Sequence, residues 1–176
     1  FTQIISGKVC VKKKNCIFAP DMANSVLPRI PLKSISNTPG EFRYSLTDAF
    51  FNELDQEDLA GGEIEVNATV TKDRENQAYS LDFSIKGFVK VACDRCLDEL
   101  QIPIEAHDHV KLVMDEEETS DSDFVRTIDR RTQEYDMSDD IFQLIELSLP
   151  IQRVHDEGSC NEEMLNVLRE HSRKEE

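Results

Sequence analysis

The sequence predicts a single α+β domain built on an antiparallel sheet. Several stretches between residues 42 and 114 alternate apolar and polar residues, which is the pattern of half-buried strands. No long helical pattern separates these stretches, so neighbouring strands are expected to pair antiparallel in a curled sheet or partial barrel. A short helix is expected after the second strand, and two helices at the C-terminal end.

The N-terminal elements follow from local chemistry. Residues 26–32 combine apolar positions with two prolines and predict an edge strand, because proline cannot donate to a central ladder. Phe42, Tyr44 and Leu46 alternate with polar residues and predict the second strand. A short helix over 49–54 is expected to follow, with Thr47 or Asp48 as its cap, before Gly61 and Gly62 end the unit.

The clearest hairpin lies in the middle of the chain. Residues 64–70 and 79–85 alternate on either side of a polar turn, and Gly87 predicts a bulge or bend in the second strand. Another strand pair is expected around Ile102–Ile104 and Val110–Met114.

The two C-terminal helices have start and stop signals. Apolar residues of 141–149 share one helical face, with Ser138 or Asp139 as the expected cap and Pro150 as the stop. A last helix is expected to start at Asn161.

Charge divides the chain into parts and excludes one class of function. The net charge is −16, which argues against a protein that grips nucleic acid by neutralising phosphates. Residues 1–24 carry +3, leaving −19 for residues 25–176. We expect 1–24 to be a poorly structured basic tail, a candidate non-native extension with Met22 as the candidate start. Residues 115–123 hold six acids and predict a solvated loop within the 25–176 domain.

Five cysteines suggest the compartment and the site. An odd number without a recognisable export signal is typical of reduced thiols, which places the protein in the cytoplasm. No apolar run approaches the roughly 20 residues of a membrane helix. Cys93 and Cys96 form a C-x2-C pair, and His155 and Cys160 follow after 58 intervening residues. Three thiolates and an imidazole are ligands that Zn²⁺ favours, so these four residues are a candidate structural zinc site.

Other readings of these residues stay open at this level. They can be reduced thiols that merely pack together. Cys93 and Cys96 can also form a redox pair, which makes a cytosolic thiol oxidoreductase the alternative function, although such a pair prefers a helix N-terminus. A nucleophilic pair of Cys93 with His155 would need an orienting group and an oxyanion hole that the sequence does not show. His107 and His109 share one strand face, where exposed polar positions explain them.

Two segments resemble a known family. Residues 88–103, FVKVACDRCLDELQIP, are similar to its strand, C-x-R-C and proline step. Residues 134–160, EYDMSDDIFQLIELSLPIQRVHDEGSC, are similar to its second signature, a helix ending in L-x-L-P-I followed by His and Cys. The chain therefore resembles the YceD-like family, the large ribosomal RNA subunit accumulation proteins.

The resemblance implies a ribosome-biogenesis factor without established catalytic activity. Carried over by position, the family's motif residues fall on Cys93, Arg95, Cys96, His155 and Cys160. Because an acidic domain is repelled by bare RNA, we expect basic partners, such as a large-subunit ribosomal protein or an assembly factor. Contact with rRNA would then be indirect, or local at Arg95. No membrane and no small-molecule substrate are indicated.

Overall fold

The computed structural model describes residues 27–36, 38–54, 56, 58–73, 77–115 and 125–172. The expected basic tail, 1–24, lies outside these residues. So does the expected acidic loop, 115–123, apart from Asp115.

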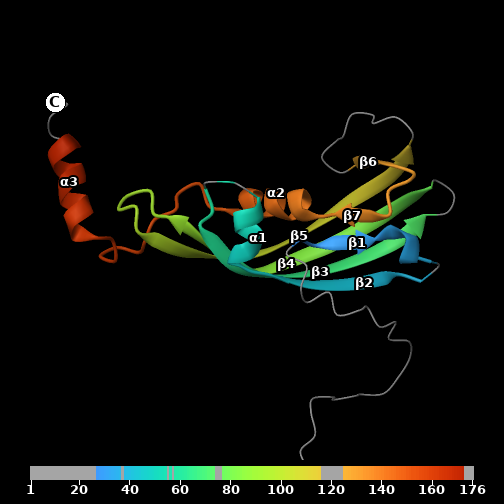
Figure 1. Cartoon of the computed structure of the whole chain (residues 1–176). Coiled ribbons are helices and arrows are strands. Elements are labelled where there is room, and N and C mark those ends of the chain that lie inside the picture. Colours follow the sequence, from blue (N-terminus) through green and yellow to red (C-terminus); the bar gives the residue numbers. More distant parts are fainter. Residues whose placement is uncertain are drawn as a thin grey trace, which may run out of the picture.

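A five-stranded sheet forms the body of the protein (Figure 1). Its strands, in spatial order, are β2 (Gly40–Leu46), β3 (Gly61–Asp73), β4 (Ala78–Ala92), β5 (Glu99–Asp115) and β6 (Val125–Asp129). The first four pair antiparallel, but β6 runs parallel to β5, so the sheet is mixed and the all-antiparallel prediction is wrong for this strand. β2 and β6 are its two edges, and the sheet is therefore open.

The predicted hairpin forms the centre of this sheet. β3 and β4 pair along their whole length, with Val66 opposite Ile85 and Val70 opposite Leu81. These four side chains are buried together with the Ala68–Phe83 pair between them, while the residues that alternate with them face the opposite side of the sheet. The period of two in the sequence thus marks one buried and one open face.

Two strand predictions need correction. β5 is one continuous strand of 17 residues, so the expected pair around 102–104 and 110–114 is wrong. The expected bulge at Gly87 is also wrong, because Gly87 stays in register between Ile64 and Ile104. A Cβ atom there would lie 1.9 Å from the backbone oxygen of Glu63, so glycine serves close strand approach instead.

One face of the sheet is covered by the remaining strands and by two helices (Figure 1). The covering elements are β1 (Arg29–Pro31), a 3-10 turn η1 (Leu32–Ser34), α1 (Asp48–Glu53), β7 (Glu134–Asp136) and α2 (Ser138–Ser148). β1 pairs antiparallel with β7 as a separate two-stranded sheet. The side chains that these elements contribute to the main core include Ile30, Leu32, Phe50, Phe51, Ile141 and Ile145.

The last helix stands apart from this core. α3 (Glu162–Ser172) lies beyond the end of the sheet where β4 turns into β5 (Figure 1). It starts one residue after the expected Asn161, whose side-chain oxygen accepts a hydrogen bond from the Glu163 N–H. The N-cap residue of α2 is Met137, so the prediction of Ser138 or Asp139 is wrong, and the Asp136 carboxylate accepts a hydrogen bond from the Ser138 N–H.

Candidate metal centre

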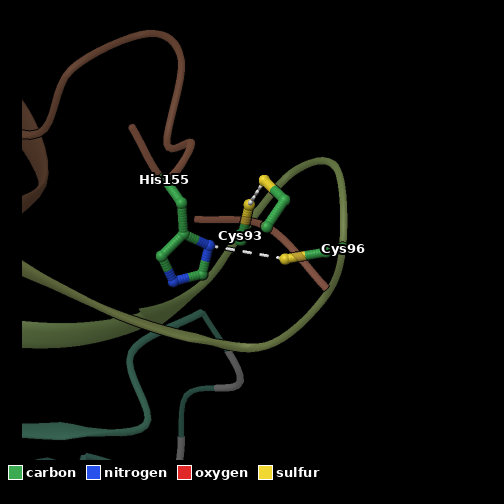
Figure 2. A group of neighbouring side chains, drawn as sticks. Cys93, Cys96 and His155 are labelled. Atoms are coloured by element: carbon green, nitrogen blue, oxygen red, sulfur yellow. Dashed lines mark hydrogen bonds between the residues drawn. The ribbon is translucent and has the colours of Figure 1, made fainter. Parts of the chain in front are cut away.

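Two short turns bring the four predicted ligands together. Cys93 and Cys96 lie in the turn between β4 and β5, and His155 and Cys160 lie in the segment between α2 and α3. The ligand atoms of all four residues lie within 4.8 Å of one another. Figure 2 shows Cys93, Cys96 and His155 gathered at the turn, with the His155 ring facing Cys96. The structure therefore joins residues that 58 intervening positions separate in the sequence.

The distances fit a tetrahedral ion better than a covalent bridge. Cys93 Sγ lies 3.9 Å from Cys160 Sγ, and Cys96 Sγ lies 3.4 Å from His155 Nδ1. With Zn–S near about 2.3 Å and Zn–N near about 2.0 Å, tetrahedral ligand atoms are spaced by roughly 3.5–3.8 Å. A disulfide needs about 2.05 Å between sulfurs. The donor set and these two distances therefore fit a metal ion of the zinc type.

A second hydrogen bond orients the His155 ring. Its Nε2 lies 3.1 Å from the backbone oxygen of Glu99 and donates to it, because a carbonyl oxygen can only accept. In the neutral ring, Nδ1 then carries the lone pair and faces Cys96. Outer partners of this kind fix the tautomer of metal-binding histidines. Glu99 is a site residue that the sequence did not reveal, because it contributes its backbone.

The first turn is shaped by its own backbone. The Leu97 N–H donates to Cys93 O at 2.9 Å, and the Cys93 N–H donates to Asp98 O at 2.9 Å. Leu97 takes a φ of +63°, an uncommon conformation for a leucine. These bonds close a tight loop that turns both cysteine side chains inward.

Two hydrogen bonds between Asp94 and Arg153, which we call the latch, join the two turns. The Asp94 N–H donates to Arg153 O at 2.8 Å, and the Arg153 N–H returns a bond to the Asp94 carboxylate at 2.7 Å. Beside it, the Arg95 guanidinium donates to His155 O at 2.8 Å. Asp94 and Arg153 were missed by sequence reasoning, since neither belongs to the cysteine and histidine set of the candidate site and no spacing relates them.

Burial and hydrogen bonding bias the cluster toward one thiolate. Cys93 and Cys96 are fully buried, and Cys160 is 6% exposed. Burial opposes ionisation of Cys93, but backbone N–H groups, led by that of Cys96, outweigh it and lower the Cys93 pKa to about 6. Hydrogen bonds to the two nearby sulfurs, Cys93 first, raise the His155 pKa. The Cys160 pKa is raised mainly by burial and secondly by hydrogen bonds with the sulfurs of Cys96 and Cys93.

A small apolar group surrounds the ligands. Val154 and Leu165 pack against the three cysteines, and this cluster is separate from the main core. Leu165 belongs to α3, so the cluster is where this helix meets the rest of the protein. A bound ion would therefore fasten the C-terminal helix to the sheet.

The geometry does not favour the redox or nucleophilic readings. An oxidoreductase needs an accessible thiol at its reactive pair, but both sulfurs of C-x2-C are buried, and each faces a residue of the second turn. The His155 ring is oriented by a backbone carbonyl, and its neighbours are further thiols. Four ligands would also fill a tetrahedral ion, which is the closed arrangement of structural rather than catalytic zinc.

The other predicted residues lie away from this cluster. His107 and His109 are exposed on the open face of the sheet, where His109 Nδ1 contacts the Asp82 carboxylate at 2.7 Å. Arg95 is exposed at the site but engages the backbone of His155. In the part of the chain that the structure describes, no helix combines the length and apolar character needed to cross a bilayer.

Together, these features define a class: a small α+β protein with an open sheet and a C-x2-C/H-x4-C ligand cluster at one end. The C-terminal helix packs on that cluster.

The particular family follows from comparison with known proteins. Residues 81–176 match the family described as large ribosomal RNA subunit accumulation protein YceD. The match covers more than half of the chain, so the protein belongs to the YceD family, as the two sequence segments predicted. It includes all four candidate ligands. No curated protein and no solved structure matches the chain.

Proposed function

We propose that this protein is a non-enzymatic factor that supports the synthesis or accumulation of large-subunit ribosomal RNA. The family match over residues 81–176 carries this proposal, because the family is described by that role. The cysteine chemistry supports the non-enzymatic part: the buried, mutually facing thiols present no open position for a substrate or an activated water. We place the activity in the cytoplasm, on the reduced, odd set of cysteines.

We further propose that the cluster holds one structural zinc ion. Three sulfur ligands and one imidazole nitrogen are a soft donor set that suits zinc better than the oxygen-preferring magnesium or calcium. Cys93, Cys96, Cys160 and Nδ1 of His155 would hold the ion. It would supply no chemistry beyond cross-linking the two turns, and the latch of Asp94 with Arg153 pre-aligns them.

The charge of the protein supports action through basic proteins. A chain of net charge −16 is repelled by the phosphate backbone but attracted to the positive surfaces of ribosomal proteins or assembly factors. Contact with rRNA would then be indirect, or local at the exposed Arg95 beside the candidate zinc site.

The proposal is tested in cells that lack the protein. We expect the ratio of large-subunit to small-subunit rRNA to fall, and the wild-type chain to restore it. In vitro, the full chain is mixed separately with naked large-subunit rRNA and with the basic proteins extracted from large subunits. We expect retention of proteins and no retention of RNA. An unchanged rRNA ratio would refute the role. Tight binding to naked rRNA that weakens steeply between about 50 and 200 mM salt would refute action through proteins.

A further inference from the structure

Most of the outer side of β5 has no neighbouring strand. β6 pairs only with the last five residues of β5, from Lys111 to Asp115. The preceding part, residues 99–110, pairs with β4 on one side and with no described strand on the other. An unpaired strand edge is a template for another extended chain.

Hydrogen bonds show which residues of β5 direct their backbone outward. The Met114 N–H donates to Gln77 O on the β4 side, so even-numbered residues of β5 bond toward β4. Because successive residues of a strand alternate, odd-numbered residues point away from β4. Two bonds agree: Glu99 O accepts from His155, and the His109 N–H donates to the Asp108 side chain.

Between Glu99 and His109, the outward backbone N–H groups of β5 have no hydrogen-bond partner within the described chain. Among the residues that the structure describes, none bonds to the outward N–H groups of Gln101, Glu105 and His107. Pro103 also falls on the outward side, where its missing N–H costs the ladder with β4 nothing. Backbone groups without a protein partner must be hydrated, because burying them unpaired costs free energy. This edge is therefore available to a partner strand.

A hollow adjoins the start of this edge. It has a volume of about 440 Å³ and lies between Leu100–Pro103 of β5 and the segment 150–156. His155 lines it as well, so the hollow borders the candidate zinc site. A chain added along β5 would thus run up to the turn that the ion fastens.

Charge indicates what kind of chain fits. Acidic residues dominate the edge and its surroundings: Glu99, Glu105, Asp108, Asp156 and Glu157. Two nearby basic side chains are engaged with acids: Lys86 pairs with Glu105, and Arg153 pairs with Asp94. The other four acids, Glu99, Asp108, Asp156 and Glu157, form no ion pair within the described residues, so they are the ones that would attract a basic chain. A second copy of this chain would bring the same acids to the edge, and a nucleic acid would bring phosphates. Neither is complementary.

We propose that the outer edge of β5, residues 101–109, binds an extended lysine- or arginine-rich segment of a partner protein by adding it to the sheet. Backbone hydrogen bonds would give the affinity, and the acidic side chains would select a basic segment. This inference rests on the proposed action through basic proteins and names the surface that receives them.

The test uses the full chain and a synthetic peptide of alternating lysine and valine, seven residues long. We expect this peptide to bind and either to shift the NMR signals of the Gln101, Glu105 and His107 amides or to protect these amides from hydrogen exchange. His107→Pro removes one outward N–H and should weaken binding at least tenfold, whereas His107→Ala keeps that N–H and should bind like wild type. Arg43→Pro is the matched control, because the same alternation puts its N–H on the outer side of β2, the other edge.

Four results would overturn the inference, the fourth being retention of the extracted basic proteins by His107→Pro. The first is equal binding by the proline and alanine variants at position 107. The second is that the lysine–valine peptide binds equally well with and without N-methyl groups at every residue. This test uses the wild-type protein, so it remains valid if the proline variant misfolds. The third is equal binding of a glutamate–valine peptide. If His107→Pro still retains the extracted basic proteins, the edge is wrong and the proposed function stands. If wild type retains none, the proposed action through basic proteins itself fails.

Discussion

Replacing Cys96 with serine tests the candidate metal centre most directly. Cys96 is fully buried and its Sγ lies 3.4 Å from His155 Nδ1, so the change removes one of four ligands from the cluster. Serine keeps the size and the buried position but is a poor ligand for a soft-donor site. We expect wild-type protein, purified without a histidine tag, to carry one zinc ion per chain. We expect Cys96→Ser to carry little or none.

The size of the effect on stability follows from linkage. Zinc at 100 times its dissociation constant stabilises the folded state by about 2.7 kcal/mol. Losing even an outer partner of a metal ligand weakens binding about 10- to 100-fold. A 100-fold loss at the same zinc concentration leaves about 0.4 kcal/mol of that stabilisation. Cys96→Ser should therefore lower the stability of the region that the ion joins by about 2 kcal/mol.

The loss should be local. The cysteine cluster is separate from the main core, and α3 meets it through Leu165. Hydrogen exchange should therefore accelerate in residues 155–172 while β3 and β4 stay protected. Elemental analysis measures the zinc, and Val154→Ala is the matched control, since it trims the packing around the cluster but leaves every ligand. Wild type without zinc, or Cys96→Ser with a full zinc ion, would refute the reasoning.

Three further predictions follow from single contacts. Asp94→Ala should lower zinc affinity about tenfold by opening the latch between the turns, as measured by chelator competition; unchanged affinity would contradict this role. Gly87→Ala should cost about 3 kcal/mol in urea unfolding because its Cβ would meet a backbone oxygen of β3, whereas Gly158→Ala, at φ +83° in open space, should cost about 1 kcal/mol. The Asp48 pKa is lowered mainly by a hydrogen bond from a backbone N–H of β3 and secondly by Lys90. The ionised carboxylate therefore stabilises the fold at pH values above its ordinary pKa of 3.8, and this stabilisation is lost as the pH falls through the lowered pKa. Asp48→Asn should therefore lower the urea midpoint at pH 7 more than at about pH 3; equal losses would contradict this linkage.

Local patterns in the sequence were sufficient for the hairpin and for the ligand types. The period of two along 64–70 and 79–85 marks a half-buried strand wherever it occurs, because alternate side chains leave opposite faces of the backbone. The pair at Cys93 and Cys96 and the pair at His155 and Cys160 each show their chemistry within a few residues. The paired signatures also identified the YceD family, which the comparison confirmed.

Other features have no local signature. The parallel pairing of β6 with β5 is a contact between two strands, and the residue types within each strand do not indicate the direction in which they pair. The continuity of β5 depends on its pairing with β4, which keeps Pro103 on the outward side of the strand.

The sequence by itself determined the α+β class, the central hairpin, the family and the four candidate ligands. Only the tertiary structure decided that those ligands meet, because 58 residues separate the two pairs and place no limit on their distance. They are brought together by the latch of Asp94 with Arg153 and by the bond from His155 to the start of β5. Each of these contacts has at least one backbone group as a partner, which every residue carries, and so residue types and spacing do not reveal the pairing.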